Sequence, residues 1–311
     1  MEQQKLEVAK SNLEKTLKLL SEVILGKPDE IRLALTCILA QGHLLIEDLP
    51  GTGKTTLSHG IASALGLDFQ RVQFTSDMLP SDIIGAVIFE REAGTFKFHP
   101  GPIFTQLVLA DEVNRATPKT QSALLEAMEE RQVTVDGETK ALPHPFFVIA
   151  TQNPSHQIGT FPLPESQLDR FLMRLSLGYP GVAEERELLM GQDRRKLARK
   201  IECCLPREEL ICLQQAVEAI KVSRTLADYL LDLISASRAD HRCQHGLSPR
   251  AGVMCLKAAR AWALMENRDH VLPEDIQAVF VHVAAHRLSL NEEGDGIELA
   301  NSWLLQTPLP T

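Results

Sequence analysis

An apolar run leads directly into Glu47-Asp48-Leu49-Pro50-Gly51-Thr52-Gly53-Lys54-Thr55-Thr56, and a helical pattern follows. Residues 43–46, just before the glycines, have the length and composition of a buried parallel strand. Residues 57–65, just after them, repeat apolar side chains at helical spacing. The loop is therefore predicted to be the turn from a strand to a helix, and we expect an α/β domain around it.

The glycines and the lysine of this turn are suited to binding phosphate. Gly51 and Gly53 let the backbone bend so that its amides and the helix N-terminus face an anion. Lys54 supplies a positive charge for the β- and γ-phosphates of a nucleotide, and the Thr55 hydroxyl can ligate Mg²⁺. The strict motif has glycine where Asp48 stands, but the Pro-Gly step can make the turn without it. The alternative is a glycine-rich turn that carries a surface lysine.

Length and composition indicate a globular protein of two domains. The 311 residues are 44% hydrophobic and 23% charged, and no apolar run is long enough to span a bilayer. A net charge of −9, from 32 basic and 41 acidic residues, argues against a broad duplex-binding surface. The N-terminal residues 1–18 are polar, unlike a signal peptide, so we expect the cytoplasm. The six cysteines lack metal-ligand spacing and are interpreted as reduced thiols, with a redox role of Cys203-Cys204 left open.

Strand and helix patterns divide the chain near residue 182. An opening helix ends at Gly26-Lys27-Pro28, and buried strands are predicted at 43–46, 69–74, 107–110, 146–150 and about 175–177. After these, the sequence predicts helices alone, at 184–200, 206–220, 226–239, 249–266 and 273–287. We therefore expect residues 1–182 to form the opening helix with an α/β nucleotide-binding domain, and residues 183–311 to form an α-helical lid.

Two β-hairpins interrupt the strand pattern. In residues 87–98, both arms alternate apolar with polar residues around Ala93-Gly94. In the second, residues 132–135 run into Asp136-Gly137, a strong signal for a two-residue turn. Either hairpin is an insertion into the α/β domain or an edge of its sheet.

The acidic pair Asp111-Glu112 follows the predicted strand at 107–110. Open α/β sheets hold ligands at the carboxyl ends of their strands. Asp111 there can hold Mg²⁺ directly or through water, and Glu112 can polarise the water that attacks a γ-phosphate. The alternative is an acidic pair that interacts only with a helix dipole.

Three further polar residues are candidates for the same chemistry. Asn153, in Ala150-Thr151-Gln152-Asn153-Pro154, can bond the attacking water, although Asn before Pro is also a turn former. Arg170 can act as an arginine finger on a neighbouring subunit, or pair with a nearby carboxylate, and Arg174 is its rival. Arg250 opens a predicted lid helix, where contact with a γ-phosphate would couple the lid to the nucleotide, although it can also be a solvated charge.

Two other clusters are interpreted as surface features. Residues 194–200 carry five basic side chains among glutamates, which is typical of a solvated helix face. His241 and His245 have i,i+4 spacing, but no glutamate stands between them as in the metalloprotease pattern, and Gly246 interrupts the helix.

With these anchors in order, the chain resembles the AAA+ ATPases and, more narrowly, the MoxR family. The specific stretches are Asp48 to Thr55, Gln73-Phe74-Thr75-Ser76-Asp77-Met78-Leu79-Pro80-Ser81-Asp82, Phe98-His99-Pro100-Gly101-Pro102-Ile103-Phe104, Ala110-Asp111-Glu112-Val113-Asn114-Arg115-Ala116, Ala150 to Pro154, and Leu163-Pro164-Glu165-Ser166-Gln167-Leu168-Asp169-Arg170-Phe171. The similarity runs from about Gly26 to Arg287.

The resemblance implies a fold, a site and an assembly. The fold would be a five-stranded parallel sheet of order 5-1-4-3-2 with the two hairpins inserted, followed by the helical lid. Nucleotide contacts would come from the phosphate loop (Pro50, Gly51, Thr52, Gly53, Lys54, Thr55 and Thr56) and, on the adenine side, from Gly26. Thr55 and Asp111 would hold magnesium. Glu112 would be the catalytic base, Asn153 the first sensor, Arg170 the finger and Arg250 the second sensor.

The family assembles as rings, usually hexamers, with ATP between subunits. Its members act as chaperones on other protein complexes, often with a partner that carries a von Willebrand factor A domain. We therefore expect an ATP hydrolase that remodels a protein client. Two alternatives are a nucleic-acid ring motor of the same fold class and a nucleotide-responsive scaffold that does not hydrolyse ATP. The acidic composition disfavours the first and the intact acidic pair disfavours the second.

Overall fold

A parallel sheet forms the centre of the molecule. The computed structural model describes residues 2–153, 159–291 and 294–310, so Pro154 of the strand-end motif lies outside the described residues. The five parallel strands are β1 (Leu44–Glu47), β2 (Phe69–Gln73), β5 (Leu107–Asp111), β8 (Phe147–Gln152) and β9 (Met173–Leu175). They lie side by side in the order β2-β5-β8-β1-β9. Counted among parallel strands only, this is the predicted order 5-1-4-3-2, and the predicted fold class is confirmed.

Helices cover both faces of the sheet, because its strands are apolar on both sides. Leu44 and Ile46 of β1 point into one hydrophobic core, and Leu45 between them points into the other. The first core contains side chains of α1 (Glu2–Val23), α2 (Pro28–Leu39), α3 (Lys54–Ala64) and α9 (Arg207–Ala219). The second contains side chains of α5 (Pro118–Glu130).

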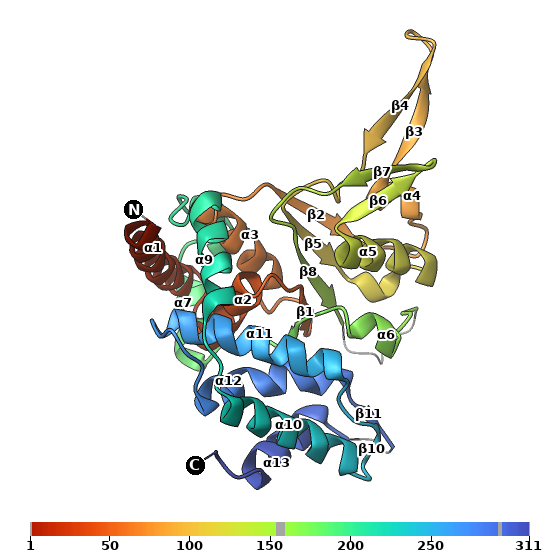
Figure 1. The fold of residues 1–311 in the computed structure, drawn as a ribbon. Coiled ribbons are helices and arrows are strands. Elements are labelled where there is room, and N and C mark those ends of the chain that lie inside the picture. The colour runs from red at the N-terminus through yellow and green to blue at the C-terminus, as the bar shows by residue number, and fades with distance from the viewer. Residues whose placement is uncertain (1, 154–158, 292–293, 311) are drawn as a thin grey trace.

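Both predicted hairpins are present outside the parallel sheet. The first consists of β3 (Gly85–Glu90) and β4 (Thr95–Pro100), and the second of β6 (Gln132–Val135) and β7 (Glu138–Ala141). The first follows the short helix α4 (Pro80–Ile84) and projects away from the body of the molecule (Figure 1). Near its tip, the exposed rings of Phe89 and Phe96 lie 5.1 Å apart, centroid to centroid.

The C-terminal part is mainly helical, with three differences from the prediction. The single helix expected at 184–200 is two helices, α7 (Val182–Met190) and α8 (Arg194–Arg199), because the chain breaks at Gly191 and the Asp193 side chain caps α8. A small antiparallel pair, β10 (Cys243–His245) with β11 (Ser289–Leu290), was not expected. The helix α13 (Gly296–Gln306) was also missed.

The remaining C-terminal helices are α10 (Arg224–Ala239), α11 (Pro249–Met265) and α12 (Pro273–Ala284), and short helical turns lie at α6 (Glu165–Leu168), Val113–Arg115 and Ala285–Arg287. His241 and His245 are both exposed, as their interpretation as surface histidines predicts, and they do not share a helix, because His245 lies in β10 and His241 in the turn before it. The helices α11 and α12 pack against α2, α9 and β9, so one hydrophobic core continues from the sheet into the C-terminal part (Figure 1). The boundary expected at residue 182 falls at the start of α7 and stays a prediction. Within the described ranges, every helix is too short or too polar to cross a membrane.

Candidate functional site

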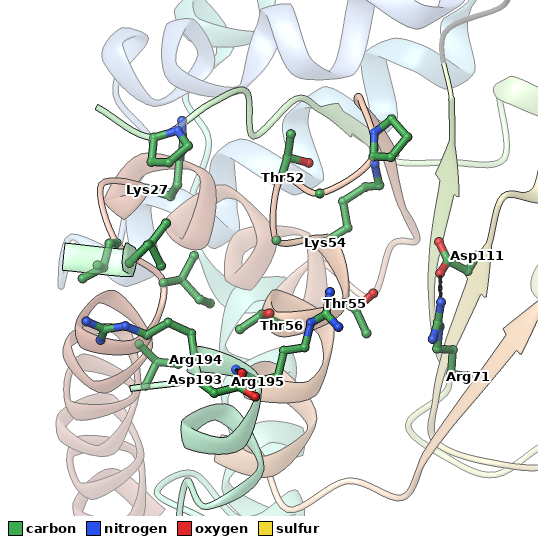
Figure 2. A pocket seen from close by; sticks show the side chains of 18 of the residues that line it. Lys27, Thr52, Lys54, Thr55, Thr56, Arg71, Asp111, Asp193, Arg194 and Arg195 are labelled. Atoms are coloured by element: carbon green, nitrogen blue, oxygen red, sulfur yellow. Dashed lines mark hydrogen bonds and ion pairs between the residues drawn. The ribbon is translucent and has the colours of Figure 1, made fainter. Parts of the chain in front are cut away.

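A cavity of about 670 Å³ lies beside the phosphate loop. It is lined by residues 50–56, by the ends of β2 and β5, by Asn153 after β8, by residues on either side of Gly26, and by the start of α8. Figure 2 shows Lys54, Thr55 and Thr56 on one side of this space, and Arg71 with Asp111 on another. The structure thus brings together residues that lie up to 172 positions apart in the chain, from Val23 to Arg195.

The phosphate loop has the backbone that its glycines predict. Gly51 and Gly53 have φ angles of 92° and 97°, which other residues rarely adopt, and a Cβ at either position would meet nothing within 4 Å. The loop therefore presents open backbone beside the first turn of α3, which begins at Lys54. The Lys54 ammonium donates to the carbonyl oxygens of Asp48 (2.9 Å) and Leu49 (2.7 Å). Burial lowers its pKa, against the attraction of Asp48, Asp111 and Glu112.

Asp111 is 7% exposed and is held by two side chains. Its Oδ1 accepts from the Thr151 hydroxyl at 2.6 Å, and its Oδ2 accepts from the Arg71 guanidinium at 2.6 and 3.1 Å. Arg71 comes from β2 and also lines the cavity. The sequence analysis missed Arg71, for which the only signal was a charge on a strand beside the acidic pair.

Glu112 directly follows β5 and has a left-handed conformation, with φ 57° and ψ 47°. This turn directs its carboxylate to three donors. Its Oε2 accepts from Gln73 (3.0 Å) and pairs with Arg115 (3.1 Å), and its Oε1 accepts from Asn153 (3.3 Å). The sequence placed Glu112 and Asn153 at neighbouring strand ends, and the structure brings their side chains into contact beside the cavity.

On the predicted adenine side, the neighbours of Gly26 line the cavity, but Gly26 itself does not. These neighbours are Ile24, Leu25 and Lys27. Gly26 has a φ of 69°, and Glu184 of α7 lies 2.9 Å from the position of a Cβ there, so glycine is needed for the close approach.

The basic cluster at 194–200 is largely exposed, as expected for a solvated face, but it also reaches the site. Arg194 and Arg195 at the start of α8 line the cavity, and Figure 2 shows Arg195 near Thr55 and Thr56. Arg194 pairs with Glu187 and donates to the Glu22 carbonyl oxygen at 2.9 Å, while Arg195 is exposed. The sequence analysis did not place these arginines at the nucleotide site.

Two predicted site arginines do not line the cavity of their own chain. Arg250 at the start of α11 pairs with Glu129 (2.5 Å) and Asp169 (3.5 Å), away from the phosphate loop. Arg170 follows Asp169 and is partly exposed. Arg174, the rival finger, pairs with Glu47 at 2.8 Å and so belongs to the β1–β9 pair.

The donor set suits Mg²⁺ bound together with phosphates. Thr55 and Asp111 supply one hydroxyl and one carboxylate, the hard oxygen ligands that Mg²⁺ prefers. A search of the described residues finds no group of three or more His, Cys, Asp or Glu that could hold a metal ion without a ligand. A magnesium ion here would therefore rely on phosphate oxygens and water for its remaining ligands.

Comparisons with known proteins agree with this site. A family model described as the ATPase family associated with various cellular activities (AAA) matches residues 43–173, and a model of the AAA lid domain matches residues 235–301. A crystal structure of a proposed ATPase from Cytophaga hutchinsonii superposes with a TM-score of 0.89 at 34% identity, covering 99% of this chain and 98% of that one.

Named relatives narrow the family. The Bacillus subtilis protein YeaC is 44% identical over 288 residues, which are 92% of this chain and 90% of YeaC. The chaperone MoxR1 of Mycobacterium tuberculosis is 37% identical over 310 residues, covering 96% of this chain and 81% of MoxR1. The protein MoxR of Paracoccus denitrificans is 34% identical, covering 88% of this chain and 87% of its own length. These relatives are similar over most of the chain, and the family model covers its phosphate loop and acidic pair. The chain therefore belongs to the MoxR family of AAA+ ATPases.

Proposed function

We propose that this protein hydrolyses ATP to ADP and phosphate and uses the reaction to remodel or activate a partner protein complex. The observation that carries the proposal is the single cavity shared by the phosphate loop, Asp111, Glu112 and Asn153. A carboxylate, an amide and a lysine at one phosphate-binding loop are the groups that phosphoryl transfer to water needs. The chaperone MoxR1, which is similar over most of its length, supports the remodelling role.

Each residue has a defined task in this reaction. The open amides of the loop and the Lys54 ammonium bind the β- and γ-phosphates, which requires Lys54 to leave the carbonyl oxygens it now contacts. Thr55 and Asp111 hold magnesium, which neutralises charge on the phosphates when bound. Glu112 takes a proton from the attacking water, and Asn153, already bonded to Glu112, orients that water.

We further propose a ring, with six subunits as the family's usual number, in which Arg170 and Arg250 act on a neighbour's nucleotide. Neither arginine lines the cavity of its own chain. Arg170 follows Asp169 in the sequence and Arg250 pairs with the Asp169 side chain, so both lie in the same region of the molecule. An arginine presented at a subunit edge can stabilise charge on the γ-phosphate of the next subunit. Glu129 and Asp169, which now pair with Arg250, would release it on assembly.

The projecting β3–β4 hairpin is proposed to face a protein rather than a nucleic acid. Its exposed aromatic pair, Phe89 and Phe96, offers apolar contact area, and Lys97 is neutralised by Glu90 at 3.1 Å. A von Willebrand factor A domain is the partner class that the family favours. We place this activity in the cytoplasm, in line with the absence of disulfides among the six cysteines, all of which are free thiols in the described structure.

Two substitutions test the hydrolase. Lys54→Ala removes the charge that faces the phosphates and is expected to weaken ATP binding roughly 10- to 100-fold. Glu112→Gln keeps the size and the hydrogen-bond capacity of the side chain, so it is expected to retain ATP and to lower phosphate release by about 100-fold or more. Equilibrium binding of a fluorescent ATP analogue and steady-state phosphate release measure the two effects.

The same assays separate the alternatives. Near-native phosphate release by the Glu112→Gln protein would show that the base is another group. Tight ATP binding by the native protein without phosphate release would favour the non-hydrolysing scaffold. Co-purification of the Glu112→Gln protein with ATP, followed by identification of what stays bound, would then reveal the client.

A further inference from the structure

The residue that breaks the strict phosphate-loop motif, Asp48, is a buried carboxylate that accepts three hydrogen bonds from backbone amides. It is 6% exposed and follows the last residue of β1. Its Oδ1 accepts from the Leu49 amide at 2.8 Å, inside the loop. Its Oδ2 accepts from the amides of Leu177 and Gly178, both at 2.7 Å, although these lie about 130 residues further along the chain. Glycine, the usual residue here, can make none of these bonds.

The segment that Asp48 holds is the exit from the sheet. Residues 176–181 connect β9 to α7, and Pro180 in this segment lines the cavity. The chain then continues through α7 and α8, and Leu188 and residues 191–195 of this part line the cavity. Lys27, on the adenine side, donates to the Tyr179 carbonyl oxygen at 3.3 Å. One carboxylate therefore joins the loop to the first residues of the chain that closes the cavity.

Asp48 also contacts the lysine of the loop through its backbone. Its carbonyl oxygen accepts from Lys54 at 2.9 Å, and its amide donates to Gln152 of β8 at 3.2 Å. A phosphate that draws Lys54 away removes one bond from the Asp48 backbone while the side-chain bonds to residues 177 and 178 remain. Bonds from backbone amides to a buried carboxylate are short and charge-assisted, so a shift of Asp48 is passed on to its partners rather than absorbed.

We propose that Asp48 is a positioning residue that couples phosphate binding at the loop to residues 177–195, a segment that lines the nucleotide cavity with Pro180, Leu188 and residues 191–195. This inference rests on the proposed ATP-binding function. The departure from the motif then has a function. The loop keeps its phosphate-binding glycines at 51 and 53, and Asp48 adds hydrogen bonds to the 177–178 segment that a glycine could not make. Asp48→Gly restores the strict motif and removes the link, together with the bond that the carboxylate accepts from the Leu49 amide inside the loop.

Hydrogen–deuterium exchange, measured with and without ADP on the full chain, tests the coupling. In the native protein, ADP is expected to slow amide exchange both in residues 49–56 and in residues 177–195. In Asp48→Gly the slowing at 49–56 should remain, because the loop amides still bind phosphate. The slowing at 177–195 should fall by about tenfold, the typical size of a coupling between two sites.

Two further variants keep the test decisive. Asp48→Asn is nearly isosteric and should fold. Its single side-chain oxygen can accept either from Leu49 or from residues 177 and 178, and it carries no charge, so the response at 177–195 should be weaker than in the native protein. Asp275→Asn is the control, because Asp275 is another buried carboxylate that accepts from a backbone amide, that of Leu272 at 2.7 Å, and it also pairs with Arg268 outside the cavity lining. This control should lower stability and leave both responses to ADP unchanged.

The outcomes separate the coupling from the proposed function. Native-like slowing at 177–195 in both Asp48 variants would overturn the coupling and leave ATP binding intact. Loss of slowing at 49–56 as well would assign Asp48 to the phosphate site itself and also overturn the coupling. No response to ADP anywhere in the native protein would overturn the proposed function together with the inference.

Discussion

At the scale of single residues, the carboxylates of Asp111 and Glu112 are already bonded to protein side chains, and a bound nucleotide with its metal must replace some of these bonds. Glu112 adopts a left-handed backbone conformation that costs free energy for a residue with a side chain, and such strain concentrates at functional sites. The conformation directs the carboxylate to Gln73, Arg115 and Asn153 instead of continuing the strand. The neighbouring Asp111 is held by Arg71 in the same way. Both carboxylates are thus neutralised by protein groups before any ligand binds.

Arg71 is expected to compete with magnesium for Asp111. Arg71→Met keeps the length of the side chain and removes the charge, so Asp111 becomes free to bind the cation. Because the Arg71 side chain is 47% exposed, the ion pair is partly screened and the expected effect is modest. We expect the Mg²⁺ concentration for half-maximal binding of a fluorescent ADP analogue to fall about two- to fivefold.

Arg115→Met is the control for Arg71. Its side chain is 50% exposed and pairs with Glu112 rather than with Asp111, so the charge lost and its exposure are matched. The Mg²⁺ requirement of this control should stay at the native value. An equal change in both variants would mean that general electrostatics, and not competition at Asp111, sets the magnesium affinity.

The sequence predicted the polar site residues that lie at strand ends, but it missed Arg71, which lies within a strand. Asp111, Glu112 and Asn153 were predictable because the carboxyl ends of parallel strands meet at one edge of a sheet. Arg71 lies two residues before the end of β2, with its Cα opposite Leu109, and only its length brings its guanidinium to Asp111. Alternation along a strand predicts which face a side chain occupies, but not how far it reaches.

At the scale of elements, long periodic segments and tight turns were predictable, whereas short pairs and helix breaks were not. The turns at Ala93-Gly94 and Asp136-Gly137 fixed both hairpins from local sequence. The strands β10 and β11 have three and two residues and pair across more than 40 positions, so no local pattern specifies them. An isolated glycine such as Gly191 is tolerated within helices, and the packing of α8 on α3 and α1 decides that the chain breaks there.

The break between α7 and α8 has a functional consequence, because it turns the start of α8 toward the nucleotide cavity. Arg195→Ala is expected to weaken ADP binding about threefold, and the difference from the native protein should diminish at high salt, as for an exposed charge. Lys196→Ala is the control: it removes the same charge from the next residue, which is also exposed but does not line the cavity. If both substitutions weakened ADP binding equally, the basic residues of α8 would be only a solvated face without a specific role at the cavity.

At the scale of the whole molecule, the C-terminal helices are fastened to the sheet of their own chain. Arg287, whose side chain is 4% exposed, donates to Asp169 at 2.8 Å and to the Phe171 carbonyl oxygen at 2.6 Å. The hydrophobic core that continues through α2, α9, α11 and α12 adds to this attachment. A large rotation of these helices against their own sheet would expose that core, so nucleotide-dependent motion is more favourable between subunits than within one.

The proposed role of Arg170 at the contact between subunits can be tested by mixing two inactive variants. Lys54→Ala has a defective pocket and an intact Arg170, whereas Arg170→Ala has an intact pocket and no finger. If the finger acts on a neighbour, a mixed ring contains intact pockets that face intact fingers, as a head-to-tail interface requires. In a one-to-one mixture with random order, about a quarter of the sites satisfy both conditions, so phosphate release should recover to about a quarter of the native rate.

Each variant alone should stay inactive at every protein concentration. A mixture no more active than the average of its components would place Arg170 at the pocket of its own chain, or outside the reaction.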